Sequence, residues 1–204
     1  MESKIVAIVG GTASGKTTIA SGLARIAGSE RAVCLPLDSY YRCSGHLSPE
    51  KRAIQNMDHP DTLDHVLYAA HLKALASGEV IDAPIYDFKT HTRSPVVERV
   101  ESKSIIFAEG ILVLHYPEVR ALCDYAIFLD VPQEERLARR ISRDTRERGR
   151  TEKSVVEQWT SNVQPMHEAF CEPTKVYATE VLAGFIDESE LSGLWGRIRK
   201  IARD

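Results

Sequence analysis

The stretch that decides the fold is "KIVAIVGGTASGKTTIA", residues 4–20. Lys4–Val9 is a short apolar run typical of a buried strand, and Thr17–Ile26 carries apolar residues at helical spacing. Between them stands G-x-x-x-x-G-K-[ST], a P-loop whose backbone N–H groups bind phosphate oxygens together with the positive N-terminal end of the next helix. The pattern predicts a nucleotide-phosphate site formed by Gly10, Gly11, Thr12, Ala13, Ser14, Gly15, Lys16, Thr17 and Thr18.

The rest of the chain repeats the alternation of strand and helix. Further apolar strands are predicted over residues 32–37, 104–108, 125–131 and 180–186, and helices over 63–76 and from residues 132 and 190. Such strands are typical of a parallel sheet with helices on both faces. Residues 80–101 alternate and contain prolines, which predicts an inserted β-hairpin suited to holding a substrate. We therefore predict an α/β fold, a single P-loop NTPase-type domain over residues 1–204.

Two carboxylates follow predicted strands as the P-loop does. Asp38 follows the second strand and Glu109 the third, so both are expected at the rim of the sheet beside Gly10. Thr17 and Glu109 are the predicted residues for organising Mg²⁺. We interpret Asp38 as the base for an acceptor hydroxyl, or as a group that orients the acceptor or the magnesium ligands. The alternatives are a helix N-cap for Asp38 and a surface side chain for Glu109.

An arginine-rich stretch, "RLARRISRDTRERGR", occupies residues 136–150. Its planar, permanently charged side chains suit phosphate oxygens, and Gly149 offers a hinge. We predict a lid over residues 144–153 that closes on the transferring phosphoryl group. The residues predicted to serve it are Arg140, Arg143, Arg148 and Arg150. A solvated helix face paired with nearby glutamates is the preferred interpretation for Arg136, Arg139 and Arg146.

Composition excludes several other classes of protein. A net charge of −3 gives no general attraction to nucleic acid or anionic membranes, and the apolar runs are too short to span a bilayer. The sequence shows no signal peptide, and its four cysteines are isolated, so reduced thiols and a cytoplasmic location are expected. Neither asparagine is followed by lysine, so the N-K-x-D guanine signature of a GTPase switch is absent.

Several unusual motifs occur together in one order: "GGTASGKTT", "LDSYYR", "NMDHPDTLD", "PIYDFKTHTR", "EGIL", "RRISRDTRERGR" and "FCEPTKVYA". In these the chain resembles the uridine kinase family from the P-loop to about Lys175. The resemblance implies transfer of the γ-phosphoryl group of ATP (or GTP), with Mg²⁺, to the 5′-hydroxyl of uridine and cytidine, as in pyrimidine salvage. It also implies a homo-oligomer, often a tetramer, with feedback by pyrimidine nucleoside triphosphates.

The resemblance also implies a role for each matching residue. Asp38 is the implied catalytic carboxylate, with Lys16, Arg143 and Arg148 acting on the transferred group. The implied nucleoside-binding residues are Tyr41, Met57, Asp58, Tyr86, Phe88, His91, Arg140, Arg150 and Gln158. Met57 stands where the family usually has an aromatic residue, and a methionine is softer and less shape-specific. The C-terminal part departs from the family pattern, and Asp187 is the candidate for the adenine side.

Two alternatives stay open at this point. The first is a P-loop kinase of another small alcohol, such as ribulose 5-phosphate or pantothenate. The second is a nucleotide-binding regulatory module without catalysis. The hairpin sequence "YDFKTHTR" favours a nucleoside over other alcohols, and the carboxylate Asp38 favours an enzyme over a mere binder.

Overall fold

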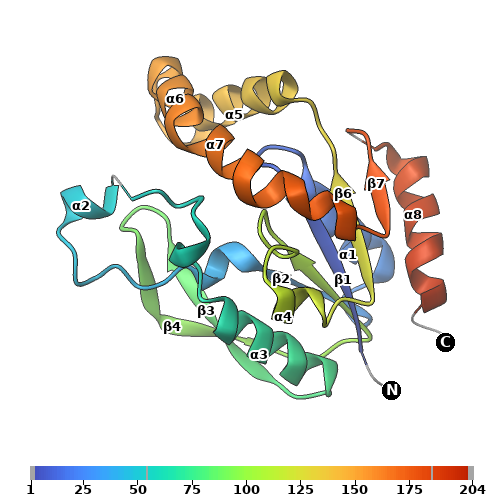
Figure 1. Cartoon of the computed structure of the whole chain (residues 1–204). Coiled ribbons are helices and arrows are strands. Elements are labelled where there is room, and N and C mark those ends of the chain that lie inside the picture. Colours follow the sequence, from blue (N-terminus) through green and yellow to red (C-terminus); the bar gives the residue numbers. More distant parts are fainter. Residues whose placement is uncertain (1–2, 54, 185, 202–204) are drawn as a thin grey trace.

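A parallel sheet forms the centre of the molecule. In the computed structural model, which describes residues 3–53, 55–184 and 186–201, the strands lie in the order β2–β5–β1–β6–β7 (Figure 1). Every neighbouring pair is parallel. The bounds are Lys4–Gly10 for β1, Ala32–Pro36 for β2, Ile105–Glu109 for β5, Tyr125–Leu129 for β6 and Glu180–Leu182 for β7. The predicted fold class is therefore confirmed.

Helices cover both faces of this sheet. On one face, α1 (Lys16–Ala27) and α8 (Glu188–Ile201) pack over Val6 and Ile8 of β1, whereas Ala7 and Val9 face the other side, where α3 (His65–Ala76) and α4 (Pro117–Arg120) lie. Successive residues of a strand point to opposite faces, and both faces of β1 are buried. This explains the continuous apolar run that identifies the strand in the sequence.

The predicted hairpin is present as a separate two-stranded sheet. Strand β3 (Ile81–Asp87) pairs antiparallel with β4 (Thr92–Val100), and the register shifts between Pro84 and Tyr86. In Figure 1 the hairpin lies beside α3, with the short helix α2 (Pro49–Ala53) near its tip. Its turn holds His91 at a φ of 53°, a left-handed conformation that is uncommon for a residue other than glycine.

The C-terminal half contains the helix predicted from residue 132, followed by helices that the sequence pattern did not predict. Helix α5 (Gln133–Glu147) is followed by α6 (Glu152–Gln158), α7 (Gln164–Met166) and a 3-10 segment, Glu172–Tyr177. Two π-helical turns, Trp159–Val163 and His167–Cys171, flank α7, and such turns are frequent at functional sites. The lid predicted over 144–153 therefore begins inside the last turn of α5. Strand β7 is also shorter than predicted.

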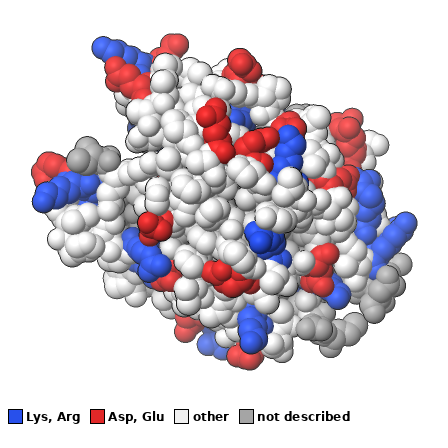
Figure 2. Space-filling view, viewed as in Figure 1, with Lys and Arg blue, Asp and Glu red and all other residues white. Residues whose placement is uncertain are grey.

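Charges of both signs are interspersed over the face of the molecule shown in Figure 2. This distribution agrees with the small net charge of the chain. Among the residues that the structure describes, no helix combines the length and apolar character needed to cross a bilayer.

Candidate active site

The P-loop connects β1 to α1 in a conformation that leaves polar atoms free for a ligand. Gly15 has a φ of 97°, and Ala13 also lies in the left-handed region, at 60°. The Lys16 Nζ donates to the carbonyl oxygen of Gly11 at 3.2 Å. The Ser14 hydroxyl is buried and has no partner in the described part of the chain. A bound phosphate would supply acceptors that this loop lacks on its own.

The neighbouring strand β5 brings a carboxylate to the start of α1. The Thr17 hydroxyl donates to Oε1 of Glu109 at 3.2 Å. Glu109 is 8% exposed, and burial raises its pKa, opposed by Lys16. A threonine hydroxyl beside a carboxylate fits Mg²⁺, because this ion is usually bound by one or two protein carboxylates together with phosphate oxygens of the substrate. The described residues contain no cluster of three or more His, Cys, Asp or Glu side chains suited to a metal.

Asp38 and Asp58 both lie near Lys16, and each also lies near arginines of its own. Asp38 occupies the 3-10 turn Leu37–Tyr40, beyond the end of β2, and the residue is exposed to solvent. The surrounding protein raises the pKa of Asp38 by desolvation, opposed by Lys16, Arg148 and Arg143. Burial likewise raises the pKa of Asp58, with Arg140 lowering it. The structure thus assembles the predicted carboxylates and cations at the rim of the sheet.

Aromatic side chains gather between Asp38 and the hairpin. The Tyr41 and Tyr86 rings lie 5.2 Å apart between centroids, and the Phe88 ring meets that of Tyr86 edge to face at 5.2 Å. Burial raises the pKa of Tyr41, and so do the charges of Asp38 and Asp58. The Tyr86 hydroxyl and the Nδ1 of His91 are buried without a partner among the described residues. Met57 is partly buried against the same core.

The arginines of α5 and of the turn after it converge on one buried carboxylate. Asp144 is fully buried and lies within 4 Å of four guanidinium groups. The distances are 3.5 Å for Arg140, 2.8 Å for Arg143, 3.6 Å for Arg148 and 3.7 Å for Arg150. These are the four arginines assigned to phosphate and lid by the sequence. Asp144 itself was missed, because it appeared as one acid within a basic stretch.

The same arginines connect the lid to the P-loop and to α6. Arg140 donates from Nη1 to the Thr12 hydroxyl at 3.1 Å and from Nη2 to the Gln158 side-chain oxygen at 3.0 Å. The Gln158 oxygen also accepts from Arg150. Gln158 therefore lies with the two arginines that the resemblance groups with it.

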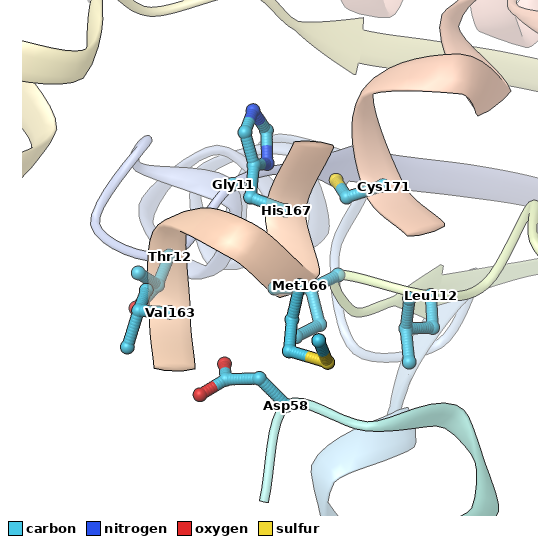
Figure 3. A pocket seen from close by; sticks show the side chains of 9 residues that line it. Gly11, Thr12, Asp58, Leu112, Val163, Met166, His167 and Cys171 are labelled. Atoms are coloured by element: carbon cyan, nitrogen blue, oxygen red, sulfur yellow. The ribbon is translucent and has the colours of Figure 1, made fainter. Parts of the chain in front are cut away.

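A small cavity separates the P-loop from the π-helical segment. Its volume is about 10 Å³, room for about one water molecule. In Figure 3 the Asp58 side chain approaches it from one side, Met166 lies in the middle, and His167 and Cys171 lie beside the P-loop. Burial lowers the pKa of His167 to about 4, helped by the charge of Arg136. None of the three residues Met166, His167 and Cys171 was predicted as part of the site.

The structure bears on the predicted surface arginines of α5 and on Asp187. Arg139 and Arg146 do pair with glutamates on the helix surface. Arg136 does not, because it is only 2% exposed, so its assignment to a solvated face is wrong. Asp187 caps α8: its carboxylate accepts from the backbone N–H of Glu190 at 2.8 Å. Its predicted place beside adenine stays a prediction.

Comparison with known proteins places this geometry among kinases. Residues 5–186 match the model of the phosphoribulokinase/uridine kinase family. The chain is 43% identical over 180 residues to the uridine kinase of Chloroflexus aggregans, covering 88% of this chain and 86% of that one. It is 44% identical over 182 residues to the uridine kinase of Clostridium novyi, covering 89% and 88%. Phosphoribulokinase from Rhodobacter spheroides has the same fold, with a TM-score of 0.65, 13% identity, and 93% and 74% coverage.

Proposed function

Because the chain belongs to the phosphoribulokinase/uridine kinase family, we propose that it transfers the γ-phosphoryl group of ATP to the 5′-hydroxyl of uridine and of cytidine. The observation that carries the proposal is the position of Asp38 between two half-sites. On one side lie Lys16 of the P-loop and two arginines, Arg143 and Arg148. On the other lies the aromatic cluster of Tyr41, Tyr86 and Phe88. A nucleoside held on that cluster presents its ribose to Asp38.

The chemistry follows from these residues. Asp38 accepts the proton of the 5′-hydroxyl on its carboxylate. Lys16 and the arginines around Asp144 neutralise charge on the transferring group, which is the main catalytic need in phosphoryl transfer. Thr17 and Glu109 would hold Mg²⁺. The ion would supply positive charge that offsets the negative charge of the phosphoryl oxygens.

Acceptor recognition is assigned to the hairpin and to Asp58. Asp58, next to Arg140, is suited to accept hydrogen bonds from the ribose hydroxyls, which favours ribonucleosides over deoxyribonucleosides. The His91 Nδ1, which has no hydrogen-bond partner in the described part of the chain, suits either base. One tautomer donates to a carbonyl oxygen such as uracil O4, and the other accepts from an amine such as cytosine N4. We therefore propose that both nucleosides are accepted. The preference between ATP and GTP, a homotetrameric assembly and a cytoplasmic location stay predictions.

An acceptor panel tests the proposal. The purified protein is given ATP and Mg²⁺, and ADP release is measured with uridine, cytidine, 2′-deoxyuridine, ribulose 5-phosphate and pantothenate. We expect turnover with the two ribonucleosides and a clearly lower rate with 2′-deoxyuridine. Turnover of ribulose 5-phosphate or pantothenate without turnover of uridine or cytidine would contradict it. Nucleotide binding without turnover of any acceptor would instead support a regulatory module.

A further inference from the structure

Arg136 is a cation buried beneath the P-loop. Its Nε donates to the carbonyl oxygen of Val131 at 3.1 Å, its Nη2 donates to the Gln164 side chain at 3.4 Å, and its Cζ lies 5.2 Å from the ring centre of Trp159. The third nitrogen, Nη1, is buried without a hydrogen-bond partner in the described part of the chain. Arginines are almost never this buried unless an anion pairs with them.

Among the described residues, the Arg136 guanidinium forms no ion pair with a carboxylate within 4 Å. The two nearby acids from other elements are already engaged. Asp130 pairs with Lys175 at 2.7 Å, and Glu172 pairs with Lys175 at 3.1 Å and lies 3.3 Å from His167. An unpaired buried charge costs folding free energy, so its retention needs a reason.

The position of Arg136 supplies that reason. A methyl group added to Gly11 would come within 2.8 Å of the Arg136 Cζ and 3.0 Å of the His167 Cε1, so the guanidinium packs directly on the P-loop backbone. The carbonyl oxygen of the same glycine accepts from Lys16. Two cations therefore approach one P-loop residue, and the Arg136 charge lies at the segment that would hold the most highly charged part of the donor.

We propose that Arg136 is a positioning residue for the donor: its charge acts at Gly11 to attract the polyphosphate into the P-loop, and the polyphosphate is the anion that this buried cation lacks. The inference rests on the proposed kinase function for the donor only. It does not depend on which alcohol is the acceptor. A charge as buried as that of Arg136 is screened less by water than a surface charge and so retains more of its Coulomb energy.

The test measures binding without turnover. Titration calorimetry gives the Kd of ADP with Mg²⁺, of inorganic tripolyphosphate and of uridine for the wild type, Arg136→Met, Arg136→Lys and Arg139→Met. Arg139 is the matched control, because it lies on the same helix but is partly exposed and paired with Glu135. Thermal unfolding of each ligand-free variant is measured in parallel.

For Arg136→Met we expect the Kd of tripolyphosphate and of ADP to rise about tenfold or more, while the Kd of uridine stays within twofold. The unfolding midpoint is expected to be unchanged or higher, since replacing a buried unpaired charge by an apolar side chain is often neutral or stabilising. Arg139→Met should leave all three Kd values within twofold. A lower midpoint together with unchanged tripolyphosphate binding would mean that Arg136 is only structural and would overturn the proposal.

Arg136→Lys keeps the question answerable if the methionine variant does not fold. Lysine keeps the charge but cannot reproduce the bonds to both Val131 and Gln164, so a structural role predicts lower stability and a charge role predicts retained affinity. We expect the Kd of tripolyphosphate within threefold of the wild type. A tenfold rise for this variant would overturn the proposal. If neither uridine nor cytidine is turned over in the acceptor panel, but Arg136→Met still raises the Kd of tripolyphosphate, only the assignment of the acceptor is contradicted.

Discussion

The Nε of Arg143 donates a hydrogen bond of 2.8 Å to Oδ1 of Asp144, and that aspartate is fully buried. The backbone carbonyl oxygen of Asp144 also accepts from the N–H groups of Arg148 and Arg150, at 3.2 and 3.1 Å. One residue therefore fixes the lid turn through its backbone and the arginines through its side chain. Its negative charge offsets the mutual repulsion of the four guanidinium groups and holds them together.

Replacing Asp144 by asparagine keeps the size of the side chain and removes the charge. We expect kcat to fall about tenfold or more because the arginines separate, and the free energy of unfolding to fall by about 3 kcal/mol, as for a broken buried ion pair. Initial rates and denaturant unfolding measure the two effects. Glu147→Gln is the control, since that carboxylate lies at the surface beside Arg146.

A double-mutant cycle separates positioning from plain destabilisation. If Asp144 acts through Arg143, the kcat loss from Asp144→Asn should be smaller in an Arg143→Gln background. Additive losses of kcat in the double variant would show that the two residues act independently, against the role assigned to this contact.

Asp144 and Arg136 show where sequence patterns stop being informative. The rim of the sheet was predictable, because apolar strands and the residues that follow them are local features of the chain. In α5, Arg136 is 2% exposed whereas Arg139, three residues further on, is partly exposed, and nothing local distinguishes a buried arginine from an exposed one. The burial of Arg136 depends on Trp159 and Gln164, which belong to the irregular helical segment that follows.

The turn that buries Asp144 is also a tertiary feature. It depends on Gly149, which adopts a φ of 63° and lets the chain fold back over the end of α5. The sequence identified Gly149 as a hinge, but not which side chain the arginines beside it would meet. The predicted roles of the site residues in substrate binding and catalysis remain to be tested by mutation.

Asp38→Asn tests the assignment of the base. We expect both substrates to bind with little change and kcat to fall on the order of 10²-fold or more. Calorimetry for binding and initial rates for turnover are the measurements. A kcat loss below tenfold would mean that Asp38 orients the acceptor without taking its proton.

The same residue predicts a pH dependence of the rate. Asp38 must be ionised to accept a proton, and desolvation raises its pKa. The kcat should therefore fall on acidification at a pH above the ordinary range of an aspartate. That acid limb should be missing from the residual activity of Asp38→Asn, and its persistence there would assign the titration to another group.

Tyr86→Phe tests the base pocket. The Tyr86 hydroxyl is buried and has no hydrogen-bond partner among the residues that the structure describes. Removing it should therefore not lower the stability of the ligand-free protein, while the KM for uridine should rise about fivefold. Tyr68→Phe provides the opposite control, because that hydroxyl donates to the carbonyl oxygen of Leu35 at 2.8 Å. Its loss should cost about 1 kcal/mol of unfolding free energy and leave the KM unchanged. An unchanged KM in Tyr86→Phe would remove this hydroxyl from the proposed nucleoside site.

His167 predicts how stability depends on pH. Burial, aided by Arg136, lowers its pKa from 6.5 to about 4. The unfolded chain therefore binds a proton between these values while the folded protein does not, so the free energy of unfolding decreases as the pH falls from 6.5 to about 4. This one group lowers the free energy of unfolding by about 3 kcal/mol once the pH has fallen to about 4. Above pH 6.5 it causes no such loss.

His71 and His115 also have pKa values lowered by burial and add a dependence of the same sign. The contribution of His167 is therefore the difference between the wild type and His167→Asn, measured by denaturant unfolding at pH 7.5, 6, 5 and 4. The difference in unfolding free energy between the wild type and His167→Asn should narrow steadily below pH 6.5, because only the wild type loses the contribution of His167. A constant gap across the series would show that His167 becomes protonated in the folded protein, and that the wall of the cavity beside the P-loop is hydrated.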